Sequence, residues 1–123
     1  MRVPRRTFFA GFIATMLAAL PLAAVAQERL PVIGLLATST PEGAAFWVEE
    51  RIEALAGLGW VMGRDYEFVS RYANGVRDPD TMRALADELV ALEPDVIITA
   101  VGIATLAADR ATTTIPIVGY VPQ

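Results

Sequence analysis

Two short segments of the sequence have residue types that suit the binding of a small polar molecule. Thr38-Ser39-Thr40 offers three adjacent hydroxyls, and Ala100-Val101-Gly102 offers backbone N–H groups beside a glycine that lets a ligand approach closely. Each segment follows an apolar run and precedes a stretch of helical periodicity. Because a helix start carries free N–H groups and the positive end of the helix dipole, two such starts favour a carboxylate or another anionic group. The alternative is that the hydroxyls only cap helices.

The side chains of most catalytic and metal sites are missing. The sequence has no Cys and no His, and all ten of its basic residues are arginine. This excludes a Cys/His zinc site, a thiol nucleophile, a histidine-based triad and a Schiff-base lysine. The carboxylate pair Asp78 and Asp80 flanks Pro79, which is the arrangement that helix capping and dipole compensation predict. We therefore expect no enzyme activity and no cofactor.

Residues 1–26 have the layout of an export signal. Arg2, Arg5 and Arg6 form a basic head, an uncharged and mostly apolar run follows, and Ala24-Val25-Ala26 supplies small residues before Gln27. We expect cleavage after Ala26 and export by either the general or the twin-arginine route, since Arg5-Arg6 resembles a twin-arginine signal. The alternative is a membrane anchor, because the uncharged run is just long enough to cross a bilayer.

Removing this segment makes the chain strongly acidic. Three of the ten arginines lie within it, so residues 27–123 carry seven basic and fourteen acidic side chains, a formal charge of −7. Such a surface repels nucleic acid and anionic lipid. We expect no nucleic-acid partner and no direct insertion into a membrane after the signal is removed.

The remainder alternates between short apolar runs and stretches with helical periodicity. Thr40-Pro41 and Asp78-Pro79 each combine a capping residue with a proline at the first helical position. Four strands joined by three helices at this spacing favour a three-layer α/β fold with a parallel sheet between helices. The expected strands are 31–37, 66–72, 95–99 and 115–121, and the expected helices are 41 to about 57, 79 to about 93, and 103–111.

The strand order decides where a ligand binds. Ligands of open parallel sheets lie beyond the carboxyl ends of the strands, where the strand order reverses. For an order of 2-1-3-4 this point lies between the first and third strands. Thr38-Ser39-Thr40 and Ala100-Val101-Gly102 are then expected to face one another.

Several segments together resemble a known family. In order along the chain, they are Pro31-Val32-Ile33-Gly34-Leu35-Leu36, Leu55-Ala56-Gly57-Leu58-Gly59-Trp60 with Gly63-Arg64, Arg71-Tyr72-Ala73-Asn74-Gly75, and Ala111-Thr112-Thr113-Thr114-Ile115-Pro116-Ile117-Val118. Their order and spacing are similar to the start of ABC-transporter substrate-binding proteins, in the group related to tryptophan and tyrosine uptake. The resemblance implies a Rossmann-like lobe of a class I periplasmic binding protein, which captures a small organic ligand, amino acid-like or carboxylate, and delivers it to a membrane permease.

The resemblance also places candidate ligand-binding residues. By position they are Thr38, Ser39 and Thr40 after the first strand, and Val101, Gly102, Ile103 and Ala104 after the third. Apart from the resemblance, the aromatic Tyr72 and Tyr120 near strand ends are candidates to stack on a ligand, the alternative being that each packs against neighbouring structure. Family members commonly have a hydroxyl residue and proline where this chain has Gly102-Ile103. Backbone donors are therefore the expected contacts at that point.

The length departs from the family. Such receptors continue into a hinge and a second lobe, so residues 27–123 are expected to be an N-terminal lobe, truncated before the hinge. Two alternatives remain open. One is a non-functional one-lobe fragment, and the other is an exported flavodoxin-like electron carrier, because Thr38-Ser39-Thr40-Pro41-Glu42 follows the first strand as a phosphate loop would.

Overall fold

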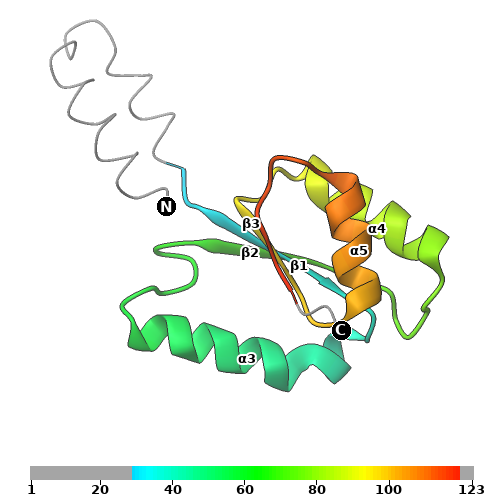
Figure 1. Ribbon diagram of the computed structural model, residues 1–123. Helices are drawn as coiled ribbons and strands as arrows, with labels where there is room; N and C mark the ends of the chain where they lie inside the picture. Colours follow the sequence, from blue (N-terminus) through cyan, green and yellow to red (C-terminus); the bar gives the residue numbers. More distant parts are fainter. Residues whose placement is uncertain (1–28, 120–123) are drawn as a thin grey trace, which may run out of the picture.

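A computed structural model describes residues 29–119, which form a four-stranded sheet between two layers of helices (Figure 1). In chain order the elements are β1 (Val32–Ala37), α3 (Pro41–Gly57), β2 (Glu67–Tyr72), α4 (Pro79–Ala91), β3 (Val96–Thr99), α5 (Gly102–Ala111) and β4 (Ile117–Val118). The expected export signal, its cleavage point after Ala26, and Tyr120 lie outside the described residues. Among residues 29–119, no helix is both long and apolar enough to cross a bilayer.

The sheet is parallel throughout and has the strand order β2-β1-β3-β4. The predicted fold class is therefore confirmed, and the mixed polarity of β2 matches its place at an edge. β4 was predicted over 115–121, but in the described chain it covers only Ile117–Val118. Pro116 has no N–H to donate, although its carbonyl accepts a hydrogen bond from Ile97 N at 2.9 Å. The prediction that this strand begins at Ile115 is therefore wrong.

Helices α3 and α4 begin as their sequences predict. Thr40 Oγ1 accepts a hydrogen bond from Gly43 N at 2.9 Å, and Asp78 Oδ2 accepts one from Thr81 N at 3.0 Å. Each bond satisfies one of the N–H groups that a helix start leaves free. α5 differs, because its N-cap is Val101, which has no side-chain oxygen to accept such a bond.

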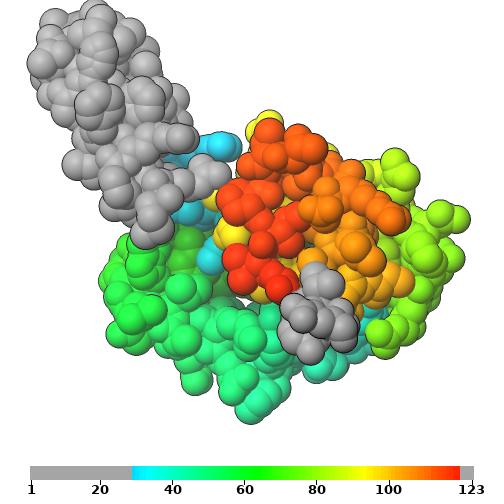
Figure 2. All heavy atoms as spheres, viewed as in Figure 1, coloured from blue at the N-terminus to red at the C-terminus, as the bar shows by residue number. Residues whose placement is uncertain are grey.

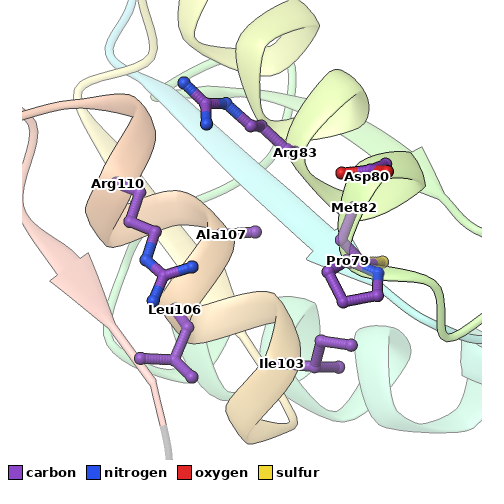
Figure 3. Close-up of a pocket in the computed structure, with 8 residues that line it drawn as sticks. All are labelled: Pro79, Asp80, Met82, Arg83, Ile103, Leu106, Ala107 and Arg110. Atoms are coloured by element: carbon purple, nitrogen blue, oxygen red, sulfur yellow. The ribbon is translucent and has the colours of Figure 1, made fainter.

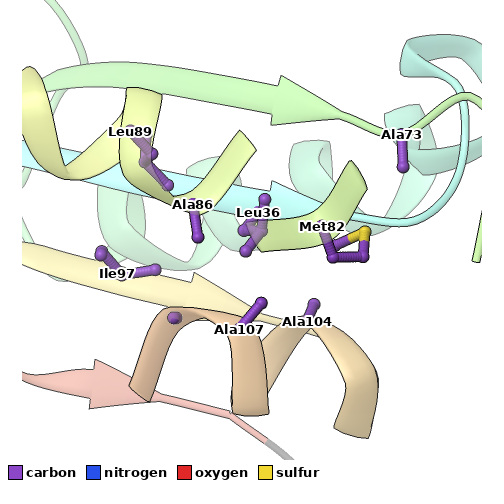
Figure 4. Close-up of a cluster of buried hydrophobic side chains, with 9 residues drawn as sticks. Leu36, Ala73, Met82, Ala86, Leu89, Ile97, Ala104 and Ala107 are labelled. Atoms are coloured by element: carbon purple, nitrogen blue, oxygen red, sulfur yellow. The ribbon is translucent and has the colours of Figure 1, made fainter. Parts of the chain in front are cut away.

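The main core lies between the sheet and the layer of α4 and α5 (Figure 4). The fully buried members from the sheet are Leu36 and Ile97, and those from α4 are Met82 and Leu89. Burying each of these side chains stabilises the fold by about 1.5–3 kcal/mol. The α5 side of the core consists of three buried alanines, Ala104, Ala107 and Ala108. Because these side chains are small, α4 and α5 approach each other closely.

α3 covers the opposite face of the sheet and is less buried than the other layer (Figure 1). The apolar face of α3 consists of Ala45, Val48, Ile52 and Leu55, which are half-buried, and of the fully buried Ala44. Glu49, Glu50 and Glu53 are exposed. Phe46, in contrast, leaves 75% of its surface in solvent. The two faces of the sheet are therefore covered unequally.

Candidate ligand-binding site at the carboxyl edge of the sheet

Residues 38–40 leave the carboxyl end of β1 and lead into α3. Thr40 is exposed and its hydroxyl caps the helix, so this side chain has a structural role. Thr38 and Ser39 are half-buried, and their hydroxyls have no hydrogen-bond partner among residues 29–119. Two of the three predicted hydroxyls are thus available to a ligand.

The loop after β2 holds residues 38 and 39 in place. Asn74 N donates to Ser39 O at 3.1 Å, and Gly75 N donates to Thr38 O at 2.7 Å. Both donors have the left-handed backbone conformation, with φ of 53° at Asn74 and 88° at Gly75. Asn-Gly tolerates this conformation better than other pairs. Because this turn is bonded to the first-strand loop, the exposed Asn74 is a further residue of the candidate site.

The start of α5 has free backbone donors. Its first bond with the preceding residues runs from Thr105 N to Val101 O at 3.0 Å. The N–H groups of Gly102, Ile103 and Ala104 have no acceptor in the part of the chain that the structure describes. Gly102 and Ile103 are half-buried, and Ala104 is fully buried. A partly buried helix start without a cap is one of the places where proteins bind anions.

A buried hydroxyl pair fixes this helix start to the sheet. Thr105 Oγ1 donates to Val101 O at 3.1 Å and lies 2.6 Å from Thr99 Oγ1. Since the single proton of Thr105 is used on the carbonyl, Thr99 is the donor to Thr105. Both residues are buried, so the pair positions the first turn of α5 rather than facing a ligand. No pattern in the sequence indicates this pair.

The two candidate segments leave the sheet from neighbouring strands. Leu36 of β1 pairs with Thr99 of β3, so the segments after these residues begin side by side at the carboxyl edge. Tyr72 ends β2 opposite Ala37 and is half-buried. The sheet therefore brings residues 38–40, 72 and 102–104 to one edge. Contact between a ligand and these residues stays a prediction.

The pKa shifts that the fold produces lie at the opposite, amino edge of the sheet. The Arg64 guanidinium donates to Asp65 Oδ2 at 2.9 Å and holds the pKa of that carboxyl below 3.8. Burial raises the pKa of Tyr66, whose hydroxyl has no partner. In residues 29–119 no cluster of His, Cys, Asp and Glu could hold a metal ion.

A surface hollow of about 190 Å³ lies away from these loops, between α4 and α5 (Figure 3). Of the predicted site residues, it includes only Ile103. No local sequence pattern indicates this hollow, because its lining residues come from two helices that only the fold brings together. Arg83 and Arg110 lie on its rim.

Comparison with known proteins gives structural neighbours only. No protein-family model matches the chain, and neither does any curated protein. A substrate-binding protein with adhesive properties from Clostridium difficile, solved in its ligand-free open form, superposes with a TM-score of 0.65 at 21% identity over 76% of this chain. A conserved domain protein from Vibrio cholerae superposes with a TM-score of 0.67 at 23% identity over 77% of this chain. An ABC domain in complex with L-Trp from Streptococcus pneumonia superposes with a TM-score of 0.65 at 17% identity over 77% of this chain.

The chain spans about a third of each of these structures, 32% in every case. The resemblance to substrate-binding proteins of ABC transporters is therefore confirmed at the level of the fold. At such identities, similar structure does not transfer a ligand or a set of binding residues.

Proposed function

We propose that this chain forms a lobe of a periplasmic solute-binding protein that captures a small organic ligand, amino acid-like or carboxylate. Support comes from the fold, which is shared with proteins that include a substrate-binding protein and an L-Trp complex. The ligand then lies at the carboxyl edge of the sheet. An acidic, exported chain of this kind delivers its ligand to the permease of an ABC transporter.

The observation that carries the proposal is the uncapped start of α5. The N–H groups of Gly102 and Ile103 are half-buried and have no acceptor among the described residues. The hydroxyls of Thr38 and Ser39, likewise without partners, follow the neighbouring strand. A carboxylate placed between them would accept hydrogen bonds from both segments and lie at the positive end of a helix dipole.

The same arrangement supports binding rather than catalysis. The segments supply hydrogen-bond donors, but no nucleophile with a base beside it. Thr99 and Thr105 are bonded to each other and buried, so neither hydroxyl is available as a nucleophile. We therefore propose a receptor without enzyme activity.

A substitution at Gly102 tests the donor role directly. Gly102 is the first helical residue, where proline is tolerated, and the preceding Val101 is extended, as a residue before proline must be. Gly102→Pro therefore removes one N–H group and keeps the helix. Gly102→Ala is the matched control, because it adds a side chain and keeps the donor.

Thermal denaturation with a panel of amino acids and small carboxylates provides the measurement. A ligand at ten times its Kd stabilises the protein by about 1.4 kcal/mol. For a domain of this size that raises Tm by roughly 5–10 °C. We expect the shift to be kept in Gly102→Ala and reduced in Gly102→Pro. Equal shifts in both variants would refute the donor role, and a bound flavin in the purified protein would refute the receptor function itself.

A further inference from the structure

The hollow between α4 and α5 combines an apolar floor with unpaired positive charge. Met82 and Ala107 form the buried floor, and Leu106 stands beside it with half of its surface exposed. Arg83 from α4 and Arg110 from α5 extend from the facing helices, with Ala107 between them (Figure 3). Neither arginine has an ion pair or hydrogen bond with another described residue. These five residues are here called the arginine groove.

The size of the arginine groove indicates what it can hold. Pockets that enclose a whole metabolite usually have about 300–1,000 Å³. The groove has about 190 Å³ and is open to solvent, with Asp80 lining it near the start of α4. It is therefore too small for such a ligand and suits one large side chain of a protein partner, as when a helix docks into the groove between two others.

α3 of the same chain presents a side chain of the complementary kind. Phe46 is 75% exposed. Glu42 lies four residues before it, and Glu49 and Glu50 lie three and four residues after it. Residues at these spacings share one helix face. All three carboxylates are exposed, and Glu42 and Glu49 have no partner among the described residues. Phe46 with these glutamates is here called the α3 knob.

We propose that the α3 knob of one copy docks into the arginine groove of a second copy. Phe46 fills the apolar hollow, and the flanking glutamates meet Arg83 and Arg110. The energetic centre of a protein interface is commonly a large side chain that fills a well-packed pocket, surrounded by contacts that exclude water. The charges match at the contact itself, because the knob carries exposed carboxylates and the two arginines of the groove have no partner among the described residues.

The positions of the two surfaces determine the kind of assembly. α3 covers one face of the sheet, whereas α4 and α5 cover the other (Figure 1). In Figure 2 the blue-green to green surface over α3 lies along the lower side of the molecule, and the orange and yellow-green surfaces over α5 and α4 lie above it and to the right. One chain cannot join its own knob to its own groove. The contact is therefore head to tail, and each added copy leaves one knob and one groove free.

Sedimentation equilibrium of the protein purified after expression of the full 123-residue chain tests the proposal. At low ionic strength and concentrations up to roughly 1 mM, the average mass is expected to rise beyond that of a dimer. Phe46→Ala, and the pair Arg83→Glu with Arg110→Glu, should each weaken association at least tenfold. All three side chains are exposed, so circular dichroism and Tm should change little.

Two control variants and a mixing experiment make the result specific. Leu58→Ala removes an equally exposed apolar side chain at the end of α3, and Arg29→Glu reverses a charge before β1; both should associate as the parent does. Mixing Phe46→Ala with the double arginine variant should restore association but stop at a one-to-one dimer, because only one working knob and one working groove remain.

Three results would overturn the proposal. The first is a parent chain that stays monomeric throughout, which would assign the groove to a different partner. The second is self-association that none of the knob or groove variants weakens. The third is a mixture of the two variants that remains monomeric, because a head-to-tail contact must be restored by mixing.

Discussion

Gly119, just after β4, has no room for a side chain. A Cβ added there would overlap Thr99 Oγ1, lie 2.7 Å from Thr105 Oγ1 and 3.1 Å from Thr105 Cγ2. These atoms belong to the buried hydroxyl pair that ties α5 to β3. We therefore predict that Gly119→Ala destabilises the fold by forcing β4 and the hydroxyl pair apart.

The expected loss combines two effects. Overpacking a filled interior costs about 1–3 kcal/mol, and breaking a buried hydrogen bond costs about 1 kcal/mol more. A total of about 2–4 kcal/mol is a large part of the stability of a domain of this size. It corresponds to a fall in Tm of at least roughly 8 °C.

Urea denaturation of the parent and variant chains measures this cost. Gly57→Ala is the matched control, because a Cβ at Gly57 has nothing within 4 Å and should be neutral or slightly stabilising. Thr99→Ala should recover part of the loss when combined with Gly119→Ala, because it removes the overlapping oxygen. If Gly119→Ala costs less than about 0.5 kcal/mol, β4 does not pack against the hydroxyl pair as described.

Three further predictions follow from local contacts. Asp78→Ala should cost about 1 kcal/mol in urea denaturation, because the carboxylate accepts from both N and Oγ1 of Thr81; a neutral result would mean that the cap does not hold α4. Tyr66→Phe should be neutral or stabilising by up to about 1 kcal/mol, because it removes a buried hydroxyl without a partner, and a clear loss of stability would reveal a hidden partner. The hydrogen bond from Arg64 lowers the pKa of Asp65 in the folded chain below its ordinary value of 3.8. The stability that this bond adds to the fold is therefore present above pH 3.8 and is lost as the pH falls through the lower pKa of the folded chain. Titration by NMR should show this lowered pKa, and Arg64→Gln should raise it.

Helix starts and the fold class could be predicted because their signals are local. A capping bond spans three residues, as between Thr40 and Gly43, so the sequence around one position contains both partners. Alternation of apolar runs with helical periodicity in turn favoured a parallel sheet. β4 was less predictable, since Pro116 removes a ladder donor inside an otherwise typical strand sequence.

The candidate site was predicted in part. The sequence placed residues 38–40 and 102–104 at the carboxyl edge, and the strand pairing agrees with this placement. It did not show that Thr40 is used as a cap while Thr38 and Ser39 stay free. Nor did it show that Asn74 bonds to the loop, because that contact joins segments that are distant along the chain.

The sequence by itself therefore determined the elements, their parallel arrangement and the chemistry that is excluded, because these depend on residue types and on short periodic patterns. The tertiary structure decided which donors remain unpaired, why Gly119 must be glycine, and that Arg83 and Arg110 line the same groove. Each of these depends on atoms from separate elements coming within a few ångströms of one another. Only packing of the helices against the sheet determines such distances.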